Sequence, residues 1–226
     1  MTTLSTGLLE ENPTQWIKEH QPSLYQLLSQ SLTKQTLSHA YLVVGQKDVL
    51  EIAQWIAALI VEQNLNENQL NQRIGAIAAL ESIDVQLLDG TSESIKKEAI
   101  INLQHQFSQA AKEVTGQKVA ILHHVENASI QALNSLLKSI EEPSGTSTTY
   151  ILTSDNLNQV LPTIQSRCVN ITCEEYHQDA LIESFEKLGI DHLSAYLISQ
   201  LTSSKTKAQQ ILNDYQLDKL SQIIYQ

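Results

Sequence analysis

The sequence predicts an α/β protein: a mostly parallel, five-stranded sheet flanked by helices, followed by a small all-helical domain. Two observations predict this class. Short apolar runs alternate with helical patterns from about residue 40 to residue 171, which is typical of βαβ units. After residue 173 the strand patterns stop and only helical patterns follow. We therefore expect one domain over residues 1–173 and a helical lid domain over residues 174–226.

Five short apolar runs are expected to form the strands. The first run ends at Gly45 and the second is closed by a turn, which fits buried strands. The expected strands are 41–44, 85–90, 118–122, 149–154 and 169–171.

Helical spacing of apolar residues predicts the segments between and after the strands. Pro22 divides residues 14–36 into two short helices, and Val49 to Val61 is expected to be an almost wholly apolar helix. The polar stretch 62–75 is expected to be a loop or a solvated helix. Ser94 is the expected N-cap of the clearest helix, which carries Ile95, Ile100, Leu103, Phe107, Ala111 and Val114. Two further helices are expected to begin after Ser129 and near Pro162. The remaining helices are expected over 178–188, 190–203 and 205–226.

Composition limits the possible functions. The chain has 226 residues, a net charge of −11 and a pI of about 5.0, which argues against nucleic-acid binding as its main activity. Cys168 and Cys173 are too few for a disulfide framework, and their spacing is a poor zinc half-site. No apolar run is long enough to span a membrane, and the first residues do not resemble a secretory signal. We expect a soluble, cytoplasmic protein with no membrane partner.

The junction after the first strand has the position of a phosphate-binding loop but lacks its functional residues. Such a loop follows the pattern GxxxxGK[ST], in which backbone N–H groups and the Lys hold the phosphates. If Gly45 is the first glycine, Leu50, Glu51 and Ile52 replace the second glycine, the Lys and the Ser/Thr. Glu51 reverses the charge, and Lys47 has no accompanying Gly or Ser/Thr. We expect this loop to bind no nucleotide cofactor.

The end of the third strand also departs from a nucleotide site. An active ATPase places carboxylates there to hold Mg²⁺, whereas this chain has His123 and His124. Imidazole is a poor magnesium ligand. A zinc site built from His123, His124 and Glu126 lacks a firm third ligand, so the sequence predicts no metal.

Four segments together carry a resemblance to a known family. They read LSHAYLVVG (37–45), NSLLKSIEEP (134–143), ILTSDN (151–156) and LPTIQSRC (161–168). In this order and at these separations they resemble the clamp-loader branch of the AAA+ (RecA-like) proteins, over roughly residues 20–175. The family's zinc-binding cysteines are missing from 62–90. Relatives continue into a collar domain, and this chain ends about where that domain would begin.

The resemblance implies a role for the Ser-Arg-Cys motif. Clamp loaders are rings of five AAA+ subunits that open a sliding clamp and close it on primed DNA, with nucleotide between neighbouring subunits. In the family the arginine of this motif projects into the ATP site of the next subunit, and Arg167, between Ser166 and Cys168, occupies that position. Ser154 and Asp155 occupy the sensor-1 position. A broken phosphate loop with an intact arginine finger is expected of a non-hydrolysing stator.

The resemblance also implies the partners. They are the tau/gamma motor subunits and the delta subunit of bacterial DNA polymerase III, together with the sliding clamp; primed DNA is contacted only indirectly. We expect no independent catalysis, only membership of a nucleotidyltransferase holoenzyme.

Two other hypotheses stay open at this point. One is an autonomous ATPase that uses Lys47 in an irregular phosphate loop. The other is a degenerate AAA+ interaction module that works outside replication.

Overall fold

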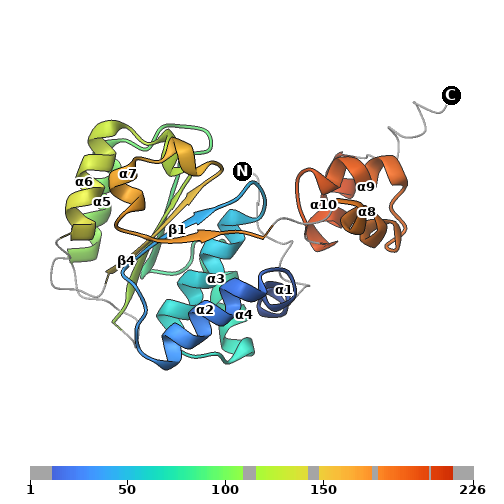
Figure 1. The fold of residues 1–226 in the computed structure, drawn as a ribbon, viewed down its shortest axis with the longest axis horizontal. Helices are drawn as coiled ribbons and strands as arrows, with labels where there is room; N and C mark the ends of the chain where they lie inside the picture. The colour runs from blue at the N-terminus through green and yellow to red at the C-terminus, as the bar shows by residue number, and fades with distance from the viewer. Residues whose placement is uncertain (1–11, 109–115, 142–147, 175–177, 204, 216–226) are drawn as a thin grey trace.

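The structure, a computed structural model, describes residues 12–108, 116–141, 148–174, 178–203 and 205–215. Five parallel strands form its central sheet in the order β2-β3-β4-β1-β5 (Figure 1). The strands are β1 Ala40–Val44, β2 Val85–Asp89, β3 Lys118–His123, β4 Thr148–Ser154 and β5 Val169–Thr172. The predicted five-stranded parallel sheet is confirmed, and all five strands end at the same edge.

Helices flank the sheet and follow it in the chain. The helices before β5 are α1 Pro13–His20, α2 Pro22–Thr33, α3 Val49–Glu62, α4 Glu67–Ala78, α5 Lys97–Ser108, α6 Ile130–Glu141 and α7 Pro162–Gln165. Two 3₁₀ turns, η1 Val125–Asn127 and η2 Leu157–Gln159, follow β3 and β4. The helices after β5 are α8 Gln178–Glu186, α9 His192–Ser199 and α10 Lys205–Tyr215. In the described part of the chain, no helix combines the length and apolarity needed to cross a membrane.

Two hydrophobic cores cover the two faces of the sheet. Side chains of a strand alternate between faces, so Tyr41 and Val43 of β1 pack against α1 to α4. Leu42 and Val44 point the other way and pack against α5, α6 and α7. Both faces are covered, which explains the continuous apolar runs VAIL in β3 and YIL in β4.

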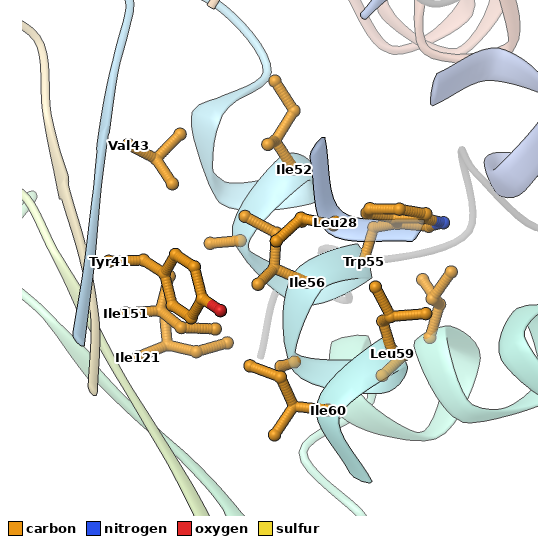
Figure 2. Packing of buried hydrophobic residues seen from close by; sticks show 14 of the residues in the cluster. Leu28, Tyr41, Val43, Ile52, Trp55, Ile56, Leu59, Ile60, Ile121 and Ile151 are labelled. Carbon is orange, nitrogen blue, oxygen red and sulfur yellow. The ribbon is translucent and has the colours of Figure 1, made fainter. Parts of the chain in front are cut away.

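Helix α3 lies in the middle of the first core. Ile52, Ile56 and Ile60 face the sheet, whereas Trp55 and Leu59 lie on the side of the helix turned away from it (Figure 2). All five side chains are at most 2% exposed. A helix buried on both sides must be apolar nearly all round, and α3 is.

Helix α4 corrects one sequence expectation. The polar stretch after α3 is a helix, but it is not merely solvated, because Leu70, Ile74 and Ile77 are buried against the first core. These residues recur at helical spacing, i, i+4 and i+7, within a segment otherwise dominated by Asn, Gln and Glu. The Asn66 side chain caps the helix by accepting from the Gln69 N–H at 3.1 Å.

The expected caps of α5 and α6 have different outcomes. The prediction for Ser94 is wrong, because α5 begins at Lys97 and the Ser94 hydroxyl donates to the Asn127 carbonyl at 2.6 Å. The prediction for Ser129 is confirmed, since its hydroxyl oxygen accepts from the Ala132 N–H at 3.2 Å. Ala111 and Val114 lie outside the described residues.

The C-terminal helices α8, α9 and α10 have a small hydrophobic core of their own. It contains Leu181, Phe185, Ile198 and Ala208, each at most 6% exposed. The segment leading to these helices is attached to the first core: the Gln21 side chain, 1% exposed, receives the Glu174 N–H at 2.8 Å and donates to its carbonyl at 3.2 Å.

We predict that Ile56→Ala destabilises the protein by about 2–5 kcal/mol, because it leaves a cavity between α3 and the sheet. Ile130→Ala is the matched control: Ile130 is 71% exposed, and its replacement should change stability by less than about 0.5 kcal/mol. Urea unfolding followed by circular dichroism measures both. Equal effects of the two variants would contradict the assigned core.

Candidate functional site

Most of the candidate residues lie where the strands end, at the edge of the sheet formed by their carboxyl ends (the carboxyl edge). Gly45 follows β1, His124 follows β3, Asp155 follows β4 and Cys173 follows β5. Ligands of open α/β sheets bind in the crevice at this edge. The Gly45 N–H donates to the Ser154 carbonyl at 3.1 Å, so the phosphate-loop position and the sensor-1 position are direct neighbours.

Gly45 has a packing role in this structure. A Cβ atom added to it would lie 2.8 Å from the Cβ of Cys173, closer than two carbon atoms tolerate. Cys173 is held there because its N–H donates to the Val44 carbonyl at 2.8 Å. The glycine therefore permits the end of β5 to lie against the turn after β1.

Asp48 immediately precedes α3, in the left-handed backbone region with φ of 56°. An Asp in this position usually caps its own helix, but this side chain does not. It accepts instead from the Thr202 hydroxyl at 3.0 Å, the Ser203 N–H at 3.1 Å and the Ser203 hydroxyl. The Asp48 side chain is only 3% exposed. The segment between α9 and α10 thus covers the start of α3.

Two lysines complete this contact. Lys207 of α10 forms an ion pair with Glu51, and its Nζ lies 3.8 Å from Asp48 Oδ1. Lys47 donates to the carbonyl of Ser199, the last residue of α9. We call Lys47, Asp48, Glu51, Ser199, Thr202, Ser203 and Lys207 the lid contact.

The lid contact occupies the place where a phosphate loop would hold an anion. Helix N-termini attract negative charge, and the first turn of α3 already has Asp48 before it and Glu51 within it. Both carboxylates are largely buried, and Lys207 lies beside both of them. Lys47, the substitute phosphate ligand in the ATPase hypothesis, is engaged with a lid carbonyl. Leu50 and Ile52 continue the apolar packing of α3.

At the end of β3 the two histidines have different surroundings. His123 is 8% exposed, and its Nδ1 lies 2.6 Å from the Thr153 hydroxyl. The same hydroxyl oxygen accepts from the His124 N–H at 3.1 Å. Burial, reinforced by the neighbouring His124, lowers the pKa of His123 below its usual value, so this ring is neutral at pH 7.

His124 faces two carboxylates. Its Nδ1 lies 3.1 Å from Glu126 Oε1 and 3.6 Å from Asp155 Oδ1. Burial alone would raise the pKa of Glu126, but hydrogen bonds from backbone N–H groups and from His124 outweigh it and hold that pKa below its usual value. Asp155, which the sequence analysis placed only at the sensor-1 position, therefore joins His124 and Glu126 in one cluster. Ser154 is fully buried, and its hydroxyl donates to the Asn156 carbonyl at 3.1 Å.

Arg167 lies on the surface, between α7 and β5. Its side chain is 38% exposed and forms an ion pair with Glu141 at the end of α6. Its Nη1 also donates to the Thr163 carbonyl at 2.9 Å. Exposed ion pairs contribute only about 0–1 kcal/mol, so the guanidinium is held in place yet easily released.

Arg167 and the phosphate-loop position lie at opposite edges of the sheet. Val169, the first residue of β5, pairs with Tyr41 near the start of β1, whereas Gly45 follows the end of β1. Tyr41 and Gly45 are four residues apart along the strand direction, which corresponds to about 13 Å. Arg167 therefore lies at the edge of the sheet opposite to the loop of its own chain.

Ser166 and Cys168, which flank Arg167, both make contacts within the protein. The Ser166 hydroxyl donates to the Thr163 carbonyl at 3.2 Å. Cys168 packs against the second core, and burial raises the pKa of its thiol to about 11. The thiol is protonated at neutral pH and is a poor nucleophile.

Sequence reasoning missed the residues of the lid contact that come from the C-terminal helices. Thr202, Ser203 and Lys207 belong to no motif, and they lie more than 150 residues from their partners. The two carboxylates at the start of an otherwise almost wholly apolar helix were the one available signal, because carboxylates buried with that helix require donors or a cation nearby.

Comparison with known proteins agrees with this architecture. A sequence profile of the family described as DNA polymerase III, delta subunit, matches residues 20–177. The delta' subunit of Bacillus subtilis DNA polymerase III is 29% identical over 196 residues, covering 85% of this chain and 59% of that protein. The delta' subunit of Pseudomonas aeruginosa is 48% identical over 58 residues, covering 26% of this chain and 17% of that protein.

Solved structures support the fold. RuvB of Thermotoga maritima, a Holliday junction branch migration motor, matches with a TM-score of 0.53 at 12% identity, covering 88% of this chain and 62% of that chain. The RecA-like AAA+ fold expected from the sequence is confirmed. Because the profile covers most of the chain and both curated relatives are delta' subunits, this chain belongs to the DNA polymerase III delta' family of clamp-loader proteins.

Proposed function

We propose that this chain is a non-hydrolysing clamp-loader subunit, a stator that lends Arg167 to the ATP site of a neighbouring motor subunit while a sliding clamp is loaded. Residues 1–173 form its AAA+ domain and residues 174–226 its lid domain. The chain spans 59% of the length of its Bacillus subtilis relative. It acts in the cytoplasm, as part of the nucleotidyltransferase holoenzyme and without catalysis of its own.

The occupied phosphate-loop position carries this proposal. In a working site, ATP would lie against the start of α3 and beneath the lid. Here the start of α3 carries two carboxylates, and Thr202 and Ser203 bind one of them directly. A triphosphate would have to displace these hydrogen bonds and approach buried negative charge. Repulsion between two unit charges 4 Å apart is about 1–4 kcal/mol at effective dielectric constants of 80 to 20.

The lid contact also supports a rigid position of the lid relative to the sheet. In an ATPase the lid can respond to nucleotide, but here protein groups bind the lid to the loop. Removing one partner of a buried charged group is costly, because the other is left without compensation. The lid is therefore held in one position relative to the sheet, as a stator requires.

The location of Arg167 supports the trans role. An arginine that served its own nucleotide would lie at the carboxyl edge of the sheet, beside Gly45. Arg167 lies at the opposite edge, exposed, and paired with Glu141. A guanidinium is always charged and offers several donors in a fixed plane, which suits a γ-phosphate. Release from Glu141 on contact with a neighbour would make it available.

The partners in this proposal are the tau/gamma motor subunits, the delta subunit and the sliding clamp. The net charge of −11 favours protein partners over direct contact with primed DNA. Co-purification of the full-length protein with the motor and delta subunits would separate this function from that of an interaction module outside replication.

We predict that Arg167→Ala, in the full-length protein within the assembled loader, lowers ATP hydrolysis stimulated by clamp and DNA. A trans arginine contributes on the order of 10³–10⁵ in rate at its site, so the contribution of the neighbouring site should disappear. The matched control is Glu141→Gln, which removes the resting partner of Arg167 and should preserve hydrolysis. Steady-state ATPase assays measure both, and full activity of Arg167→Ala would refute the finger role.

We predict that the chain alone does not bind ATP with Mg²⁺ at micromolar concentrations, because the lid contact fills the site. Isothermal titration calorimetry measures this. Micromolar binding that is lost in Lys47→Met would instead support the autonomous ATPase.

We predict that Asp48→Ala loosens the lid. The variant removes three hydrogen bonds to a buried carboxylate, and the loss of even one such bond, worth about 1.5–3 kcal/mol, should accelerate amide exchange in α8–α10 about tenfold or more. Hydrogen–deuterium exchange with mass spectrometry measures this. Glu67→Ala is the control, because Glu67 pairs with Lys18 away from the lid; unchanged exchange in Asp48→Ala would show that the contact does not hold the lid.

A further inference from the structure

A cluster of three potential metal ligands lies where β3 and β4 end. His124 Nδ1, a Glu126 oxygen and an Asp155 oxygen all lie within 4.8 Å of one another. The two distances from His124 are 3.1 Å to Glu126 and 3.6 Å to Asp155. Ligands bound tetrahedrally to zinc at 2.0–2.2 Å lie about 3.3–3.6 Å apart. The two distances from His124 are thus close to those between zinc ligands, and the two carboxylate oxygens lie within 4.8 Å of each other.

An independent observation concerns the second oxygen of Glu126. The Glu126 side chain is only 7% exposed. Its Oε1 faces His124 and also accepts from the Asp155 N–H at 3.2 Å. Its Oε2 is buried and has no hydrogen-bond partner among the described residues. Leaving one oxygen of a buried carboxylate without a partner is costly, and a cation bound by both oxygens of Glu126 would satisfy Oε2.

The protein groups of the cluster do not balance its charge. His124 Nδ1 offers at most one N–H to two carboxylates, so a neutral His124 leaves two negative charges and a protonated one leaves one. His123 lies beside the cluster, but its Nδ1 is engaged with the Thr153 hydroxyl. A divalent cation would restore neutrality where the side chains do not.

The backbone holds the ligands in place before any cation arrives. The Thr153 hydroxyl fixes the His124 N–H, and His124 itself is in the left-handed backbone region with φ of 54°. Glu126 in the following turn is tied to Asp155 through the Asp155 N–H. The ring of His123 lies 4.2 Å from that of His124, centroid to centroid. Groups around the ligands that fix their orientation are typical of metal sites.

We propose that His124, Glu126 and Asp155 bind a divalent transition-metal cation, with Zn²⁺ as the preferred ion. One imidazole nitrogen and two carboxylates suit zinc, whereas Mg²⁺ prefers oxygen ligands in an octahedral arrangement. Three protein ligands leave a fourth position for water. The sequence did not reveal this site, because its third ligand comes from Asp155, 29 residues after Glu126. The site is independent of Arg167 and of assembly.

Zinc binding to the whole chain can be measured by competition with a chromogenic chelator. We expect saturable binding of Zn²⁺ and little competition by Mg²⁺. Asp155→Asn should weaken binding about tenfold or more; Asp155 is 51% exposed, so this variant should fold normally, as circular dichroism would verify. Visible absorption of the Co²⁺-loaded protein should show the intense bands of four-coordinate cobalt and lose them in Asp155→Asn.

The chain offers a matched control in His192, whose Nδ1 lies 2.8 Å from Glu186 Oε1 on the surface. This pair has no third ligand within the described residues, so His192→Ala should leave zinc binding unchanged. The proposal is overturned if wild-type protein binds no Zn²⁺, or if Asp155→Asn and His192→Ala reduce binding equally. Because no loader is needed, these results do not depend on the proposed clamp-loader role.

Discussion

The buried carboxylate of Asp48 is the constraint on which the arrangement of this protein depends. It begins α3, the helix at the centre of the first core, yet its hydrogen bonds go to the segment between α9 and α10. A carboxylate that is 3% exposed must find donors, and within the described residues Thr202 and Ser203 supply them. Burial of one charge thus fixes the segment between α9 and α10 over the start of α3.

The two edges of the sheet therefore differ in character. At the carboxyl edge, the turn after β1 is packed against Cys173 and covered by the lid. At the amino edge, Arg167 remains on the surface with an exposed ion pair as its restraint. A subunit with this arrangement would present Arg167 to a neighbour at the amino edge and would bind no nucleotide at the carboxyl edge. This difference between the two edges is the structural basis of the proposed stator role.

The fold could be predicted from the sequence because its signals are local. Short apolar runs located all five strands, and the motif ending at Cys168 indicated the family. Helix α4 was harder to interpret, since three buried residues stand among many polar ones. The lid contact and the His124–Asp155 approach could not be predicted, because each joins residues that only the folded sheet brings together. Knowing that β3 and β4 are neighbours would have revealed the approach of His124 and Asp155. Nothing in the local pattern around Lys207 indicated the lid contact.

The span of the lid contact has a consequence for how the chain acquires its structure. Asp48 and Thr202 are 154 residues apart, and Glu51 and Lys207 are 156 apart. During synthesis from the N-terminus, the sheet can assemble while these acidic groups are still hydrated. Closing so long a loop is entropically unfavourable until the intervening structure has formed. Seating of the lid therefore belongs to the last stage of folding, and until then the start of α3 is an open, negatively charged surface.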